Sequence, residues 1–217
     1  MYRYACVTVT TSFAILLGLA APAHASARCR PPHTQTLKSN DQVRVYDKRD
    51  RYGGRDVYAC HYRTGERHYL GLSYPDAQLS YDEVSPILLR GARVAWKYTS
   101  SYRDGSSYYI AVRDMRTNEM LRSSGRAGTS DTCSDSDSCY SWEAYGPVVD
   151  RQGSAAWIAT GHNGYGSPIH KVYKSDVTRH AELVDSGAQI VHDSLMRDGR
   201  TISWRHGDEN RTAVFAR

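Results

Sequence analysis

The stretch Leu88–Thr117, LLRGARVAWKYTSSYRDGSSYYIAVRDMRT, decides the fold class of this chain. It predicts one strand that ends at Gly91, a second that closes on Trp96, a loop, and a third strand that ends at Arg116–Thr117. Apolar and polar side chains alternate with a period of two inside it, which is typical of strands that are buried on one face. A longer connection would be needed for parallel strands, so the short turns favour an antiparallel sheet.

The same arrangement of a glycine turn followed by an aromatic strand recurs along the chain. A glycine lies four or five residues before each of three tryptophans, Trp96, Trp157 and Trp204, and Tyr46 takes the tryptophan position near the start. The tryptophans are 61 and 47 residues apart. Periods of about 40–50 residues with about four strands each are typical of β-propeller blades. We therefore predict an all-β fold, a small β-propeller or a propeller-like array of about four antiparallel blades, with these three tryptophans in the core between blades.

Two further segments show how the repeat varies. Ala156 and Ile158 are apolar on the face opposite Trp157, so the strand Ser154–Ala159 is predicted to be buried on both faces. Ser123–Ser141 is polar and predicts a long loop.

Residues 91–96 read G-x-x-V-A-W, and residues 109–118 read Y-I-A-V-R-D-x-R-T-N. Together with Tyr173–Asp176 and Leu183–Gly187, they resemble the blades of secreted bacterial TolB/WD40-like β-propeller proteins. The resemblance covers nearly all of residues 36–217; it implies the fold and, for small exported members, no single activity. This chain departs from such propellers because only four units are visible and the fourth lacks its last strand. We expect the strand near Thr34–Lys38 to fill that place or to build the first blade.

Residues 1–27 predict a cleaved export signal. Arg3 gives a basic start, residues 13–21 are apolar, and Ala25–Ala27 fits the small-x-small cleavage rule. The apolar core is about half of the ~20 residues that a membrane span needs, so we expect no span after cleavage. Residues 28–217 then form a single propeller-like domain that is secreted or otherwise extracytoplasmic.

Charge and composition limit the partners. The chain has 28 Lys and Arg against 23 Asp and Glu, and no block of five or more like charges. This dispersed charge does not predict nucleic-acid binding, although it would allow attraction to anionic cell-wall polymers.

Four cysteines remain after signal cleavage, and an even number in an exported chain predicts two disulfides. Cys133 and Cys139 bracket a short Ser/Asp loop, so we expect them to pair, which leaves Cys29 with Cys60. The alternative, a metal site, lacks the C-x-x-C spacing that zinc sites favour.

Motifs for catalysis or cofactors are missing. G-x-S-x-G does not occur, the glycine-rich segment 161–166 precedes no predicted helix, and Asp131, Asp135 and Asp137 lack the glycine and glutamate of a calcium loop. His61 and His68 are predicted on adjacent strands without a third ligand. We therefore predict no catalytic residue, no metal and no cofactor.

Tyrosine is the compositional outlier, with 17 Tyr against 2 Phe. Several tyrosines lie among Ser and Gly in the segments 97–109, 140–145 and 161–167, the mixture that binding loops use. The candidate ligand-binding residues are Tyr102, Tyr109, Tyr145 and Tyr165, and packing on strand faces is the competing interpretation.

From these observations we expect an exported, non-enzymatic binding or scaffold protein acting at the cell envelope, with an envelope polymer, a glycan or a protein as partner. The alternative is an extracellular propeller hydrolase or lyase acting on polysaccharide. That activity would require carboxylates and a histidine to converge at the mouth of the channel.

Overall fold

The computed structural model describes residues 27–51, 53–73, 83–102, 105–123, 128–131, 140–163, 167–177 and 180–216 of the chain. The predicted signal, apart from Ala27, and the predicted Cys133–Cys139 bridge lie outside these ranges. None of the described residues belongs to a helix that is long and apolar enough to cross a membrane.

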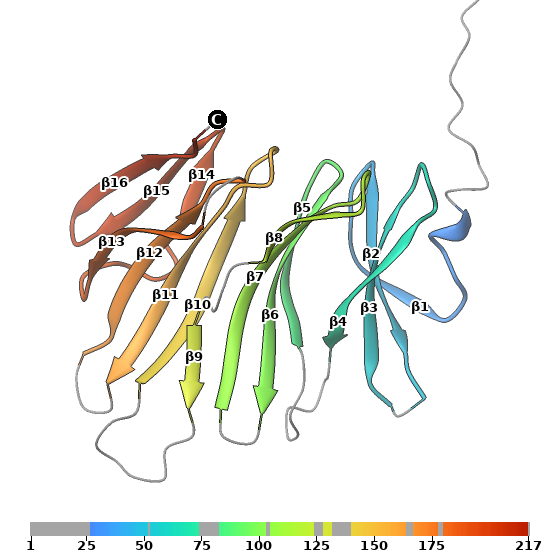
Figure 1. Cartoon of the computed structure of the whole chain (residues 1–217), viewed down its shortest axis with the longest axis horizontal. Helices are drawn as coiled ribbons and strands as arrows, with labels where there is room; N and C mark the ends of the chain where they lie inside the picture. Colours follow the sequence, from blue (N-terminus) through green and yellow to red (C-terminus); the bar gives the residue numbers. More distant parts are fainter. Residues whose placement is uncertain are drawn as a thin grey trace, which may run out of the picture.

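The described strands form four antiparallel sheets, which follow one another along the chain (Figure 1). Sheet 1 contains β1 (Thr34–Ser39), β2 (Val43–Arg49), β3 (Arg55–His61) and β4 (Arg67–Ser73). Sheet 2 contains β5 (Glu83–Arg90), β6 (Arg93–Tyr102), β7 (Gly105–Asp114) and β8 (Glu119–Ser123). Sheet 3 contains β10 (Tyr140–Val149), β11 (Ala155–Asn163), β12 (Ile169–Ser175) and β13 (Glu182–Gly187). Sheet 4 has three strands, β14 (Met196–Asp198), β15 (Thr201–His206) and β16 (Glu209–Val214).

One more strand, β9 (Gly128–Asp131), joins sheets 2 and 3. It pairs with the first half of β7, beside β8 on the second half, and it also pairs with β10. The prediction of one uninterrupted polar loop over Ser123–Ser141 is therefore wrong, and so is the prediction that the second strand closes on Trp96, because β6 continues to Tyr102. Both errors have one cause: these polar segments pair through their backbones, which need no apolar side chains.

Hydrophobic clusters fill the three spaces between neighbouring sheets. Trp96 lies between sheets 1 and 2, Trp157 between sheets 2 and 3, and Trp204 between sheets 3 and 4. The three tryptophans are 3%, 1% and 3% exposed, respectively. Every residue from Ala155 to Thr160 is buried, which confirms the predicted two-sided burial of this strand. Each aromatic residue thus packs toward the preceding sheet, as a repeat that buries its face on its neighbour requires.

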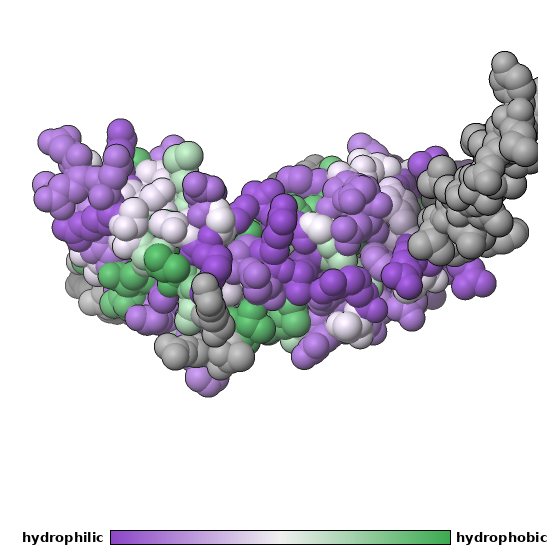
Figure 2. All heavy atoms as spheres, turned by 90° about the horizontal axis from the view of Figure 1, so that it is seen from above, coloured by the Kyte–Doolittle hydropathy of each residue, from purple (hydrophilic) through white to green (hydrophobic). Residues whose placement is uncertain are grey.

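The four sheets form an open array. Sheets 1 and 4 lie at opposite ends of it in Figures 1 and 2, while the first strands of neighbouring sheets, β1, β5, β10 and β14, contact one another in a row. The predicted all-β fold and its four antiparallel units are confirmed. Of the two places expected for the strand near Thr34–Lys38, it takes the second, because β1 pairs with β2 and builds sheet 1.

The N-terminal segment covers the outer face of sheet 1. The predicted Cys29–Cys60 disulfide is confirmed, with the two Cα atoms 5.4 Å apart. Arg44 extends the attachment by donating to the Cys29 carbonyl at 2.6 Å and by stacking over Tyr46, with its guanidinium carbon 4.8 Å from the ring centre. The segment is therefore fixed both covalently and by packing.

Candidate functional site

The turns that follow the first strands of sheets 1, 2 and 3 meet at the upper end of the array in Figure 1. Gly91 has a φ of 57°, which glycine adopts at low cost, and this allows the tight turn from β5 to β6. Asn40 supports both neighbouring turns. Its side-chain nitrogen donates to the Gly91 carbonyl at 2.9 Å, and its side-chain oxygen accepts from the Val43 amide at 2.8 Å. The turns of sheets 1 and 2 are therefore held together.

These turns enclose a polar cleft of about 450 Å³. From above, hydrophilic residues cover most of the surface over the middle of the array (Figure 2). The residues that line the cleft are Asp41, Gln42, Arg90, Gly91, Ala92, Arg93, Arg116 and Arg151. Four arginines against one aspartate give this lining a formal net charge of +3.

A buried carboxylate beneath the cleft orients two of the arginines. Asp114 is 3% exposed and lies 3.2 Å from Arg93 and 2.6 Å from Arg116. The hydrogen bond from the Arg116 side chain, with help from the backbone amide of Arg116 and the charge of Arg93, lowers the pKa of Asp114 despite burial. Asp114 therefore stays ionised, while the Arg116 side chain remains 52% exposed.

The other two arginines are not neutralised. The side chains of Arg90 and Arg151 are exposed and make no hydrogen bond or ion pair with a described residue. Their positive field reaches Arg197 on β14: burial first, and then Arg90, lower the pKa of the Arg197 guanidinium. Arg151 acts in the same direction, and Asp150 opposes it. The upper end thus holds an excess of positive charge that an anion would relieve.

This arrangement suits the binding of oxyanions. A guanidinium presents a planar fork of N–H donors that matches carboxylate, phosphate or sulfate oxygens, and hydrogen bonds to a charged acceptor are the stronger ones. Arg93 and Arg116 are held in place by Asp114, while Arg90 and Arg151 have no partner among the described residues. The cleft can therefore hold one or more anionic groups.

The predicted tyrosines do not form one site among the described side chains. Tyr109 faces the space between sheets 1 and 2, where its ring centre lies 5.8 Å from that of Tyr98. Tyr145 lies on β10 and contacts His192, in the segment before sheet 4. Tyr165 and the side chain of Tyr102 lie outside the described part of the chain. The strands that flank the three predicted loop segments do meet at one end of the array, the lower end in Figure 1.

Tyr145 belongs to a polar cluster formed by residues of β10 and β6. Its hydroxyl donates to Glu143 at 2.6 Å, and Lys97 lies 3.2 Å from the other oxygen of the same carboxylate. Burial, followed by the hydrogen bond to Glu143, raises the pKa of Tyr145 to about 12. The phenol therefore stays protonated at neutral pH, and Glu143 is already engaged by two partners.

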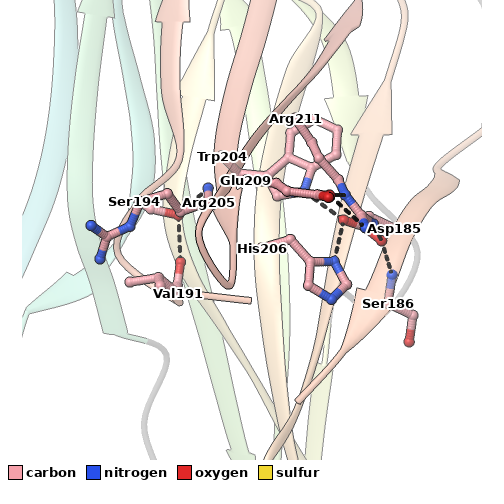
Figure 3. A network of polar contacts seen from close by, with 9 residues as sticks. All are labelled: Asp185, Ser186, Val191, Ser194, Trp204, Arg205, His206, Glu209 and Arg211. Atoms are coloured by element: carbon pink, nitrogen blue, oxygen red, sulfur yellow. Dashed lines mark hydrogen bonds and ion pairs between the residues drawn. The ribbon is translucent and has the colours of Figure 1, made fainter. Parts of the chain in front are cut away.

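A second polar network joins sheets 3 and 4 (Figure 3). Asp185 on β13 accepts from the Trp204 indole at 2.7 Å, from His206 at 2.9 Å and from Arg211 at 2.8 Å. All three donors come from β15 and β16, so a single carboxylate fixes the last sheet. Its acceptors are occupied by the protein itself, and we assign this network to stability.

The arginine cleft could not be found from the sequence because its members are spread over residues 90–151. The signal that was present is a basic residue at successive turns: Arg90 before Gly91, and Arg151 before Gly153. Within the described ranges, no group of three or more His, Cys, Asp or Glu side chains is arranged to hold a metal ion.

No protein-family model, no curated protein and no solved structure matches this chain.

Proposed function

We propose that this chain is an exported, non-enzymatic binding protein of the β-propeller type, whose arginine cleft holds anionic groups of a cell-envelope polymer. The convergence of Arg90, Arg93, Arg116 and Arg151 carries the proposal, because a single carboxylate, Asp41, lines the cleft with them within the described ranges. A polymer suits a site that is open at one end of the array and has two arginines with no partner in the described part of the chain.

The propeller type and the export rest on separate support. Four sheets of three or four strands stack face to face with their first strands in a row, and the sequence of sheet 2 resembles TolB/WD40-like blades. The predicted signal and the Cys29–Cys60 disulfide favour an oxidising compartment outside the cytoplasm.

The enzymatic alternative has one feature in its favour, the Glu143, Tyr145 and His192 cluster. A catalytic base needs an available acceptor near neutral pH. Glu143 already accepts from Tyr145 and pairs with Lys97, and the raised pKa of Tyr145 keeps it from acting as a base. Binding is therefore better supported than turnover.

The test measures binding of the mature chain, residues 28–217, to polygalacturonate, heparin and neutral dextran, while product release from each polymer is monitored. We expect both polyanions to bind in a salt-dependent manner, dextran not to bind at the cleft, and no product to form. The double variant Arg90→Ala/Arg151→Ala should weaken polyanion binding by about tenfold or more, since hydrogen bonds to charged groups contribute about 1.5–3 kcal/mol each.

The matched control is Arg49→Ala/Arg205→Ala, which removes the same charge from exposed positions on β2 and β15. Equal losses in the two double variants would show general attraction to a basic protein and would overturn the cleft. Accumulation of cleaved polymer would favour the enzymatic alternative.

A further inference from the structure

A second hollow, of about 350 Å³, lies between sheets 1 and 2. It is lined by Tyr69, Leu70, Gly71, Trp96, Tyr98, Tyr109, Ala111 and Met120. None of these lining residues is charged, in contrast to the arginine cleft. We call this space the aromatic groove.

The aromatic groove exists because sheet 2 departs from the repeat. In sheet 1, Tyr46 occupies the tryptophan position, and its cross-strand partner Tyr58 stacks on it with ring centres 5.8 Å apart. In sheet 3, Trp157 has Tyr173 as its cross-strand partner, and their rings stack at 5.6 Å. A second ring therefore covers the aromatic residue in both sheets.

Sheet 4 places a different side chain opposite its tryptophan, and sheet 2 places only a methyl group there. The partner of Trp204 is Arg211, which bonds to Asp185 of the preceding sheet. The partner of Trp96 is Ala111, a methyl group where the other sheets place a ring or a guanidinium. Trp96 is itself 3% exposed, and the groove borders it and Ala111 on the side where the other sheets place a larger side chain.

The walls of the aromatic groove are well supported. Gly71 lets β4 run close to sheet 2, since a Cβ there would lie 2.5 Å from the Val84 side chain. Tyr98 and Tyr109 form the rung next to Trp96 and Ala111, with their rings in contact. Met120, 41% exposed, lies at the outer side on β8. The groove is therefore formed by strands rather than by loops, and strands hold a shape more firmly.

We propose that the aromatic groove binds a neutral sugar ring of a polysaccharide, seated in the place that Tyr58 and Tyr173 occupy in sheets 1 and 3. A pyranose has an apolar C–H face, which packs on aromatic rings, and a rim of hydroxyl groups. The lining matches both parts, because it offers aromatic rings together with phenol groups. A volume of 350 Å³ lies at the lower end of the range for small-ligand sites and suits one or two rings.

The sugar site and the anion site use different residues, so each can fail without the other. Substitutions in the aromatic groove should leave polyanion binding unchanged, and the Arg90→Ala/Arg151→Ala variant should leave sugar binding unchanged. If both sites are present, the ligand is a polysaccharide that carries acidic groups as well as neutral rings.

The deciding variant is Ala111→Tyr, which restores in sheet 2 the ring that sheet 3 has at Tyr173. The mature chain is titrated with cellohexaose, maltohexaose and chitohexaose, followed by calorimetry and by tryptophan fluorescence, because Trp96 lines the groove. We expect at least one of these neutral oligosaccharides to bind saturably. Ala111→Tyr should abolish that binding, while Ala111→Ser, which keeps the space, should retain it.

A second test removes side chains that line the aromatic groove, and it holds even if the Ala111→Tyr variant does not fold. Tyr109→Ala should lower the affinity by about tenfold, as expected for one lost ring contact and its buried area. Met120→Ala should lower it by less, and the matched control is Leu183→Ala, which removes a 50% exposed apolar side chain from β13, the fourth strand of sheet 3.

Three outcomes would overturn the proposal. The first is no binding of any of the three oligosaccharides. The second is binding that survives both Ala111→Tyr and Tyr109→Ala at an unchanged melting temperature. The third is binding of phenol but of no sugar, which would assign the aromatic groove to aromatic ligands.

Discussion

The outer face of sheet 1 is aromatic and lies under the N-terminal segment, whereas the outer face of sheet 4 is open to solvent. On sheet 1, Tyr46 is 2% exposed and packs with Cys29 and Cys60. On sheet 4, Thr201 and Arg205 are exposed, and so are the apolar Met196 and Val214, at 68% and 56%. Both are terminal sheets of the same array, so each has one face that no neighbouring sheet covers. The N-terminal segment covers that face in sheet 1, and solvent contacts it in sheet 4.

The attachment of the two sheets differs as well. Apolar packing buries Val43, Val45 and Val57 of sheet 1 against sheet 2. Sheet 4 adds the charged network around Asp185 to its own apolar cluster. A stacked repeat needs a soluble or covered outer face at each end. The outer face of sheet 1 is covered by the disulfide-linked N-terminal segment. The outer face of sheet 4 stays exposed, while the charged network around Asp185 holds the sheet to sheet 3.

Among the variants that test this difference between sheets 1 and 4, Trp204→Ala should lower the free energy of unfolding the most. The change removes the main apolar contact of sheet 4 and leaves a cavity, which costs about 3–5 kcal/mol in the free energy of unfolding. Chemical denaturation measures it, and Met196→Ala is the control, because that side chain is 68% exposed on the same sheet. Similar stabilities for the two variants would mean that sheet 4 is not packed as described.

The Cys29–Cys60 disulfide should contribute about 3 kcal/mol to the free energy of unfolding, because it closes a loop across a sequence separation of 31 residues. The double variant Cys29→Ser/Cys60→Ser is compared with the wild type by denaturation and by hydrogen exchange. Amides of sheet 1 should lose protection before those of sheet 4. An equal loss of protection over all four sheets would show that the array unfolds as one unit and that the disulfide stabilises all of it.

Asp185→Asn tests the charged network that holds sheet 4 to sheet 3. It removes the charge that accepts from Trp204, His206 and Arg211 while preserving the side-chain shape, and hydrogen bonds to charged groups contribute about 1.5–3 kcal/mol. The loss of protection should fall on sheet 4, the reverse of the disulfide variant. Asp198→Asn, an exposed position on β14, is the control and should have little effect.

The smallest expected effect is the change in the stability of sheet 4 with pH. Burial by itself would raise the pKa of Asp185, but hydrogen bonds from Trp204 and His206 outweigh it, so the folded pKa lies below the ordinary value. The stabilisation is therefore complete above the unfolded pKa of about 3.9, and it is lost as the pH falls through the lower, folded value. Hydrogen exchange at pH 3 and pH 6 should show sheet 4 opening on acidification more than sheet 1. The difference should disappear in Asp185→Asn.

The regular parts of the fold could be predicted because they depend on short patterns. Alternation of apolar residues located the strands around Trp96, Trp157 and Trp204, and cysteine number gave the pair Cys29–Cys60. Neither the full length of β6, which continues through a Ser/Tyr-rich part, nor the presence of the polar strand β9 could be predicted, since backbone pairing extends there without an apolar face. Neither candidate site was predictable as a site, although Tyr109, a wall of the aromatic groove, was among the tyrosines chosen from composition.

The sequence by itself determined that this protein is all-β, that it has four repeating units, and that an aromatic residue marks each one. These are properties of periodicity, and periodicity is local. Tertiary structure alone decided that the array stays open, that arginines from three separate turns share one cleft, and that Ala111 lies opposite Trp96 where other sheets place a larger side chain. Each of these features depends on which strands become neighbours. The residue pattern within one repeat does not encode its contacts with other repeats.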